Sequence, residues 1–345
     1  MDSLADILAT ALWSEELATT RRSTRLALKS AFDVAVKEHR ETDEIVLSVI
    51  GRMWKSAFDQ YDQLLRFEHL VHSLAVSELL EHLGSDGESD AAYYAYAQLR
   101  LSRRANLTAE EILILSRAGC HSGAVARLRT LYETWLVMAF MAKFKTDGDD
   151  IWAHATTSTQ ASQVGSRFWA DYDSERLRFL GGFAPEDRDE TFLALLTECE
   201  ATVEKNKEKF GDNIGRPFGW ALPYLPAGVR PGYTSIEAAV DSLEIPQLYR
   251  VASWSVHPSA QNLLAEVTSG EAGEQLPAKS SGEVATPLWI SAVLLANTSQ
   301  LLAAECRSDV VQEGAEVVVA LATALADTVI EIDSDTGATV PRQTS

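Results

Sequence analysis

The sequence predicts an all-α protein: a multi-helix bundle with an N-terminal helical extension and one long loop rich in proline, glycine and aromatic residues. Apolar residues recur at helical spacing along nearly the whole chain, whereas no pair of segments alternates as paired strands do. Apolar residues make up 46% of the chain and charged residues 23%. These shares are ordinary for a globular protein and allow a sizeable core.

The N-terminal extension is expected to cover residues 1–85. A long helical pattern runs from about residue 43 to residue 83 and stops at residues 84–87, whose sequence Gly-Ser-Asp-Gly is typical of a turn. We expect the helical core domain to follow at residues 86–333, with a frayed tail at 334–345.

The first half of the core domain is expected to be helical at about residues 91–101, 108–143, 150–172 and 185–210. The second of these helices starts with a capping-box sequence, in which the Thr108 hydroxyl would accept an N–H of the first turn while Glu111 reaches back. The fourth starts at Pro185, because proline suits the first turn of a helix.

Residues 211–233 interrupt the helical pattern, because glycines and prolines recur throughout this segment. The same segment carries Phe218, Trp220, Tyr224 and Tyr233. A loop rich in aromatic residues is usually packed against its domain, so we expect a packed loop. The alternative is a lid over a site.

The remaining helices are expected at about residues 234–243, 246–257, 286–306 and 309–332, with an exposed connection at 269–284. The helix 246–257 must end near His257, because Pro258 disfavours helical backbone at the residue before it. The last two helices are long and apolar and should close the core. Polar residues interrupt the stretch from Pro287 to Ala304, which argues against a membrane span.

The formal net charge of −20 disfavours general binding to nucleic acid or to an anionic membrane, because a field of this sign repels phosphate. The densest basic patch consists of Arg100, Arg103 and Arg104. Such a patch could override the overall charge, but we interpret it as a solvated basic face.

The cysteines and histidines give no metal-ligand spacing. The three cysteines are far apart, with no CxxC pattern, so neither a disulfide framework nor a zinc site is expected. His69 and His72 lie one turn apart beside Glu68, which we interpret as a solvated helix face. We therefore expect no metal and no cofactor. The first residues lack the basic start of a signal peptide, and we expect a cytoplasmic protein.

The first candidate for chemistry is the helix that carries Arg129 and Glu133 one turn apart. Its residues 128–140 are apolar on nearly every face, which indicates a buried helix. Buried charges must be paired, or folding is penalised by several kcal/mol, on the order of 3–5. The pair either fixes helix packing or presents an arginine to an anionic group. The sequence favours neither alternative.

The second candidate is the segment from Tyr249 to His257. At about 100° per residue, Arg250 and His257 lie within about 20° of each other, and Tyr249 and Ser253 fall on the same side. The helix dipole would favour a protonated imidazole at this C-terminal position. The alternative is a histidine that caps its own helix, with the other polar residues satisfied in the core.

These segments resemble a prokaryotic helical family, domain of unknown function 5677. The resemblance rests on the ordered occurrence of residues 124–133, the Phe-Gly-Trp-Ala sequence at 218–221, and Tyr249, Ser253 and His257-Pro258. It covers about residues 105–265 and implies an all-α fold without an established activity.

A looser resemblance is to the HEPN ribonucleases of toxin–antitoxin and phage-defence systems. Six residues separate Arg250 from His257, which fits the arginine–histidine spacing of that signature. The resemblance implies metal-independent RNA cleavage through the ribose 2′-OH, with these two residues often supplied by both members of a homodimer.

We therefore hypothesise a HEPN-like RNA-cleaving or RNA-binding protein of bacterial defence, in which Arg250 and His257 are catalytic. The supporting residues would be Arg129, Glu133, Tyr249 and Ser253. One alternative is a non-catalytic helical interaction or scaffold protein that forms a homodimer or joins a complex. Another is a small-anion or nucleotide sensor with Arg129 as the anion clamp.

Overall fold

The computed structural model describes residues 29, 37, 40, 41, 43–83, 89–145, 152, 163–184, 188–240 and 284–339. These residues are predominantly helical and include no strand, which confirms the predicted all-α class. The chain divides into two compact units, residues 1–52 and 53–345. In the first unit, residues 43–50 are helical, and Lys37 Nζ lies 3.7 Å from a carboxylate oxygen of Glu41.

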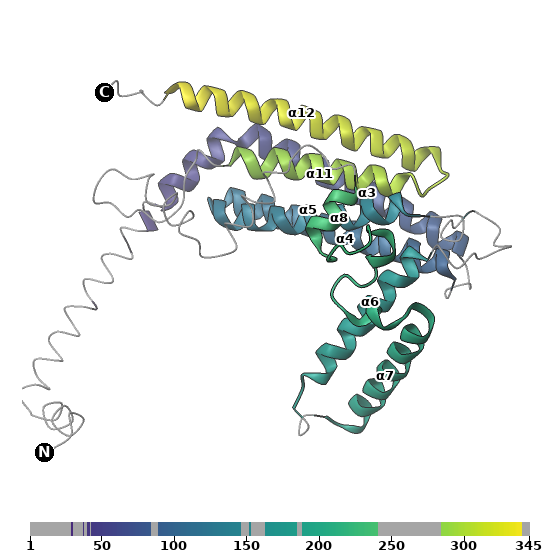
Figure 1. The fold of residues 1–345 in the computed structure, drawn as a ribbon. Coiled ribbons are helices and arrows are strands. Elements are labelled where there is room, and N and C mark those ends of the chain that lie inside the picture. The colour runs from purple at the N-terminus through teal and green to yellow at the C-terminus, as the bar shows by residue number, and fades with distance from the viewer. Residues whose placement is uncertain are drawn as a thin grey trace, which may run out of the picture. The chain divides into compact units, whose positions relative to one another are not determined.

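The second unit is built around a bundle of long helices (Figure 1). They are α3 (Lys55–Leu83), α4 (Asp90–Arg117), α5 (His121–Lys143), α11 (Ala285–Ala303) and α12 (Asp309–Thr339). Helix α11 packs against the other four, and its Leu294 and Leu295 side chains are fully buried. It is the core helix predicted for residues 286–306. Burial of this apolar helix is a major contribution to the stability of the bundle.

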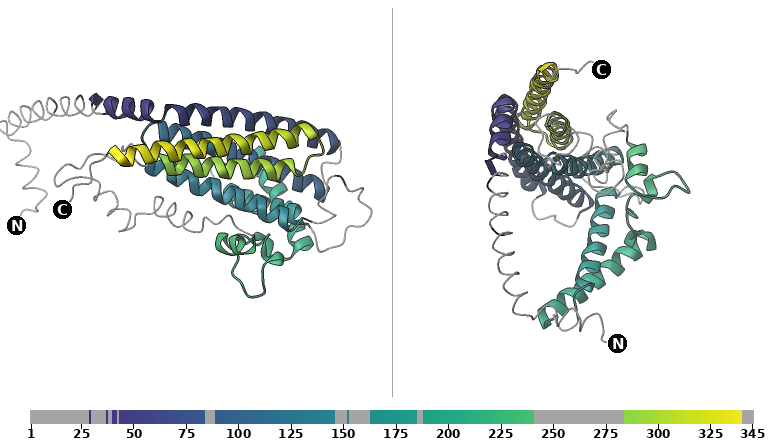
Figure 2. Two further views of the ribbon diagram at one scale, coloured as in Figure 1. Left: turned by 90° about the horizontal axis from the view of Figure 1, so that it is seen from above. Right: turned by 90° about the vertical axis from the view of Figure 1, so that its left-hand side faces the viewer.

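Helix α3 packs against α12, α4 and α11 (Figure 2). It therefore belongs to the same compact unit as the helices that follow residue 89. Side chains that follow helical spacing along α3, such as Tyr61, Leu64 and Val71, are buried in this contact. No helix of the described residues is both long enough and apolar enough to cross a bilayer.

Helix α4 differs from the sequence prediction, because it continues through the expected break between residues 101 and 108. The Thr108 hydroxyl donates to the Arg104 carbonyl oxygen at 2.9 Å, four residues earlier in the same helix, so it does not cap a new one. The break comes later, at Gly119. Its φ of 67° is a left-handed conformation that suits glycine and separates α4 from α5.

Helices α6 (Val164–Gly181) and α7 (Glu190–Phe210) lie side by side, and α6 begins against α4 (Figure 1). A methyl group at Gly165 would lie 2.4 Å from the Tyr94 Cα, so this close crossing requires glycine. The carboxylate of Asp189 caps α7 by accepting the backbone N–H of Phe192 at 2.7 Å. The helix predicted at 185–210 is thus confirmed with a later start.

The aromatic loop is packed against the bundle, as predicted. Its described structure includes two short 3₁₀ helices, η2 (Asp212–Gly215) and η3 (Leu222–Tyr224). The Trp220 side chain is 2% exposed. Its ring meets Phe140 of α5 and Phe168 of α6 edge to face, at centroid distances of 5.4 and 5.2 Å. The loop leads into α8 (Tyr233–Ala239), in the place predicted for a short helix.

Candidate functional site

Arg129 and Glu133 form the ion pair that their one-turn spacing on α5 predicts. Arg129 Nε donates to Glu133 Oε1 at 2.9 Å. The two side chains are 22% and 17% exposed, so solvent reaches both partners. The pair therefore lies at the edge of the buried face of α5, where an anion could approach the guanidinium without entering the core.

Helix α8 is attached to α5 next to this ion pair. The Tyr132 hydroxyl donates to Glu237 Oε1 at 2.5 Å, which joins the middle of α5 to α8. Burial, and after it the neighbouring Glu237 carboxylate, raise the pKa of Tyr132. The phenol consequently stays protonated and acts as a hydrogen-bond donor at neutral pH. Tyr132, the residue before Glu133, thus links α8 to this part of α5.

The other predicted site residues, Tyr249, Arg250, Ser253 and His257, lie outside the described residues. The same holds for the predicted helix 246–257 and the exposed connection predicted at 269–284. Of the predicted site, the structure therefore brings together Arg129 and Glu133 on α5.

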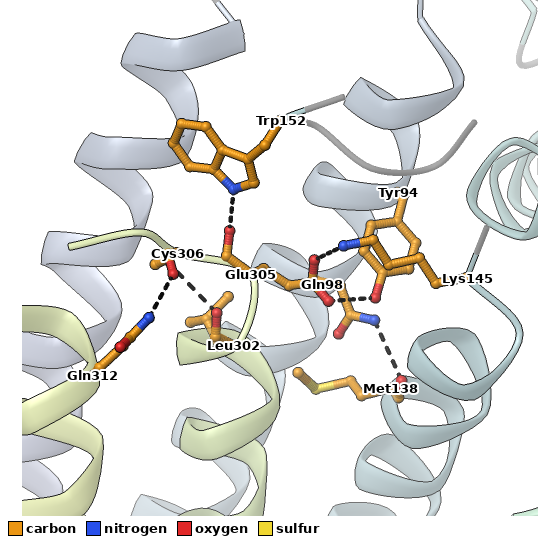
Figure 3. A network of polar contacts seen from close by, with 9 residues as sticks. All are labelled: Tyr94, Gln98, Met138, Lys145, Trp152, Leu302, Glu305, Cys306 and Gln312. Atoms are coloured by element: carbon orange, nitrogen blue, oxygen red, sulfur yellow. Dashed lines mark hydrogen bonds and ion pairs between the residues drawn. The ribbon is translucent and has the colours of Figure 1, made fainter. Parts of the chain in front are cut away.

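A second polar cluster lies at the turn between α11 and α12 (Figure 3). Glu305, 5% exposed, accepts from the Tyr94 hydroxyl at 2.8 Å and from Lys145 Nζ at 2.5 Å. Its backbone carbonyl accepts from Trp152 Nε1 at 2.7 Å. Glu305 therefore connects α4, the end of α5 and the chain beyond it to the α11–α12 turn.

The same turn holds a buried thiol. Burial, together with the Glu78 and Glu305 carboxylates, raises the pKa of Cys306 to about 12. Glu78 Oε1 also accepts the backbone N–H groups of Arg307 and Ser308, at 2.6 and 3.0 Å. A thiol that stays protonated is a poor nucleophile, so Cys306 is a structural residue rather than a reactive one.

A third polar cluster lies between α3 and α4, and it corrects the interpretation of Glu68 as part of a solvated face. Glu68 is fully buried. Among the described residues, neither its carboxylate oxygens nor the amide atoms of the buried Asn106 have a hydrogen-bond partner. Burial raises the pKa of Glu68 to about 8, although Asn106 and Arg103 both act to lower it. Glu68 is therefore protonated at neutral pH.

The two histidines of that segment also meet partners on α4. His72 Nδ1 lies 3.0 Å from the Ser102 hydroxyl, and His69 Nε2 lies 3.1 Å from Glu110 Oε1. Burial lowers the pKa of His72 to about 4, so its imidazole is neutral at physiological pH. Within the described residues, no group of three or more His, Cys, Asp or Glu side chains is arranged to hold a metal ion.

The helical bundle and its largely buried Arg129–Glu133 ion pair define an all-α protein whose polar clusters lie between helices. The sequence profile described as "Family of unknown function (DUF5677)" matches residues 95–275, more than half of the chain. The chain belongs to this family. Neither the curated proteins nor the solved structures gave a match. The matched range includes Arg129, Glu133 and the segment from Tyr249 to His257.

Proposed function

We propose that this protein binds and cleaves RNA without a metal ion, as a HEPN-like component of bacterial phage-defence or toxin–antitoxin systems. In this proposal Arg250 and His257 are the catalytic pair, and Tyr249 and Ser253 orient them. Arg129, held by Glu133, supplies a second guanidinium.

The proposal is supported above all by the attachment of α8 to Tyr132, next in sequence to Glu133 of the Arg129–Glu133 pair. Val240, the residue after α8, precedes Tyr249 by nine residues. A fully extended chain of this length spans at most about 30 Å. In this proposal the segment with the arginine–histidine pair reaches Arg129 from the end of α8.

The chemistry of the proposed site needs no redox group. His257 would accept the proton of the ribose 2′-OH as this oxygen attacks the adjacent phosphorus, and would pass this proton to the 5′ oxygen as the P–O5′ bond breaks. Arg250 and Arg129 would stabilise the charge that develops on the phosphorane oxygens. The products would be a 2′,3′-cyclic phosphate and a free 5′-hydroxyl.

We expect the His257→Ala variant to lose RNA cleavage by a factor of about 100 to 10,000, because general acid–base catalysis contributes about that much. Cleavage of a labelled single-stranded RNA would be followed by gel electrophoresis in the presence of EDTA. Tyr224→Phe serves as a control, because it removes a hydroxyl from the packed loop while keeping the ring.

A loss of RNA cleavage supports the proposal only if the variant is still folded. Equal cleavage by wild type and His257→Ala would contradict the proposal, as would the absence of any cleavage by the wild-type protein. Circular dichroism melts of both variants show whether a loss of activity follows from unfolding. A folded, inactive His257→Ala protein beside an active control is the result that the proposal requires.

A second candidate function, a helical interaction protein, is favoured by apolar residues exposed along the contact of α3 with α12. Val71 packs beside Gly314, where an added methyl would lie 2.8 Å from its side chain. One turn from each, Phe67 is 43% exposed and Val317 is 40% exposed. Exposed apolar residues on two helices that pack together are typical of a surface that binds another protein.

For this candidate we expect a homodimer that the Val317→Glu substitution dissociates, because a charge would have to be buried in the contact. Light scattering after size-exclusion chromatography gives the mass of each protein. Glu316→Gln, a change at an exposed neighbouring position, should leave the mass unchanged. A wild-type mass equal to that of one chain at about 50 μM would exclude the dimer at that concentration.

A further inference from the structure

Aromatic and cationic side chains meet on the surface where α6 begins against α4. The guanidinium carbon of Arg100 lies 5.2 Å from the ring centroid of Trp169, a cation–π distance. The Tyr172 ring lies 5.2 Å from Trp169, and the Tyr93 ring meets Trp169 edge to face at 6.4 Å. Trp169 is half-buried and Tyr172 is 46% exposed, so part of this group of rings is open to solvent.

Two further arginines continue this surface along α4. Arg104 is four residues after Arg100 and faces the same way on the helix, and Arg103 is adjacent to it. All three arginines are exposed. Among the described residues, none of the three forms an ion pair with a carboxylate, in contrast to Arg117 and Arg127 of the same bundle. We call Arg100, Arg103, Arg104, Trp169 and Tyr172 the Arg100–Trp169 surface.

The fold of the backbone sets the relative positions of Arg100 on α4 and Trp169 on α6. Gly165 lets the start of α6 touch the backbone of α4 at Tyr94, and Trp169 is one turn further along α6. The two helices therefore present the indole and the guanidinium from rigid backbone. A rigid platform is favourable for binding because little side-chain entropy is lost when a ligand docks.

We infer that the Arg100–Trp169 surface binds single-stranded RNA, with phosphates on the arginines and an unpaired base against Trp169 and Tyr172. Neighbouring aromatic rings beside arginines without a carboxylate partner suit a single-stranded nucleic acid, because each nucleotide offers a flat base and an anionic phosphate. The choice of RNA over DNA rests on the proposed function, whereas the recognition of a single strand rests on this surface alone.

The net charge of −20 sets how strongly such a surface can bind. Phosphates are repelled by the protein as a whole and attracted only close to the three arginines. Each contact with a single strand contributes a slope of about −0.7 to the dependence of log K on log salt concentration. Three contacts therefore predict a slope of about −2, and binding that is measurable chiefly at low salt.

The binding experiment uses the full chain and fluorescein-labelled 12-nucleotide probes, followed by anisotropy from about 25 to 200 mM salt. A 2′-O-methyl oligouridine is the principal probe, because it lacks the free 2′-OH and cannot be cleaved by the proposed chemistry. Oligodeoxyuridine and an RNA duplex of equal length are the comparison probes. Binding is thus measured independently of catalysis.

We expect Tyr172→Ala to weaken binding of the oligouridine by about tenfold, since one stacked base contributes 1–3 kcal/mol, roughly five- to 150-fold in affinity. Arg100→Gln combined with Arg104→Gln should reduce the salt slope by about 1.4, the value for two phosphate contacts. The duplex should bind more weakly than either single strand, because its bases are already stacked and paired.

Two substitutions on α3 provide matched controls. Arg66→Gln removes an exposed arginine about 200° around α3 from Glu68, the residue that faces α4, and Leu70→Ala removes an exposed apolar side chain one turn further on the same face. Neither should change affinity or slope by more than about twofold. Thermal melts of all variants check folding, and the exposed positions of Tyr172 and Arg100 make large losses of stability unexpected.

Affinities of the Tyr172 and Arg100/Arg104 variants equal to those of the α3 controls would overturn the inference. Tighter binding of the duplex or of oligodeoxyuridine than of the oligouridine would overturn the assignment to single-stranded RNA. The failure of the proposed catalysis can be distinguished from the failure of this inference. If only the catalysis fails, His257→Ala cleaves RNA like wild type, while the Arg100–Trp169 variants still lose binding to the uncleavable probe.

Discussion

The Glu68→Gln variant is expected to unfold at a higher denaturant concentration than wild type at pH 9, and at nearly the same concentration at pH 4. Glu68 is buried between α3 and α4, and its pKa rises from 4.5 to about 8 in the folded protein. Glutamine resembles the protonated acid in shape and never becomes charged. Above pH 8 the substitution should stabilise the fold by up to about 5 kcal/mol, at about 1.4 kcal/mol per pKa unit.

The direction of the wild-type pH dependence follows from two residues that oppose each other. Folded Glu68 keeps a proton that the unfolded chain releases above pH 4.5, so it lowers stability as the pH rises from 4.5 to 8. Folded His72 has a pKa of about 4, whereas the unfolded chain keeps this proton up to pH 6.5. His72 therefore raises stability as the pH rises from 4 to 6.5. The two effects largely cancel between pH 4.5 and 6.5.

Burial raises the pKa of Asp171 from 3.8 to about 7, so Asp171 also lowers stability as the pH rises from 3.8 to 7. Above pH 6.5, His72 no longer opposes the effect of Glu68. Wild type should therefore lose about 2 kcal/mol or more between pH 6.5 and 8. Urea unfolding at closely spaced pH values measures this loss, and His72→Gln is the control that should leave it in place. A Glu68→Gln curve parallel to wild type throughout would show that Glu68 is not buried as a protonated acid.

Most of the fold could be predicted from the sequence, because helical spacing of apolar residues continues through each element. Helices α11 and α12 begin within a residue of the starts predicted at 286 and 309. The capping-box prediction at Thr108 was wrong, because a threonine inside a helix can return its hydroxyl hydrogen bond to the carbonyl four residues earlier. The local sequence is the same in both cases, and only the continuing helix distinguishes them.

The polar clusters could be predicted only in part. The Arg129–Glu133 pair was found because both partners lie one turn apart on one helix. Glu68 was misinterpreted because its burial depends on α4, some 40 residues later in the chain. Pairs between residues distant in sequence, such as Lys145 with Glu305, leave no spacing that a single sequence reveals.

The polar residues that hold the helices in register have a common feature: each is buried, at a turn or inside a helix. Glu305 occupies a buried turn, and Gln98 is fully buried on α4, where its amide donates to the Met138 carbonyl at 3.3 Å (Figure 3). Buried polar groups stabilise little in net terms but penalise any packing that leaves them unpaired. The α11–α12 turn is therefore the place where a single substitution should be most damaging.

Replacing Glu305 by leucine is expected to destabilise the protein by about 3–5 kcal/mol. The substitution removes the carboxylate that accepts from the Tyr94 hydroxyl and lies 2.5 Å from Lys145 Nζ. Removing one partner of a buried ion pair typically costs this much. Lys145, at 21% exposed, can turn part of its charge to solvent, which places the expected loss near the lower end. Urea unfolding at pH 7 measures the change.

The double variant Lys145→Met/Glu305→Leu separates the ion pair from the packing around it. With both charges gone, no unpaired charge remains buried, so the double variant should regain about half or more of the stability lost by Glu305→Leu. Lys55→Met/Asp59→Leu is the matched control, because that pair is also 2.5 Å apart but exposed on α3, and its coupling should be below about 1 kcal/mol. If the double variant loses as much stability as Lys145→Met and Glu305→Leu lose together, the two side chains do not interact in solution. The α11–α12 turn would then be held by its backbone hydrogen bonds and by Glu78 instead.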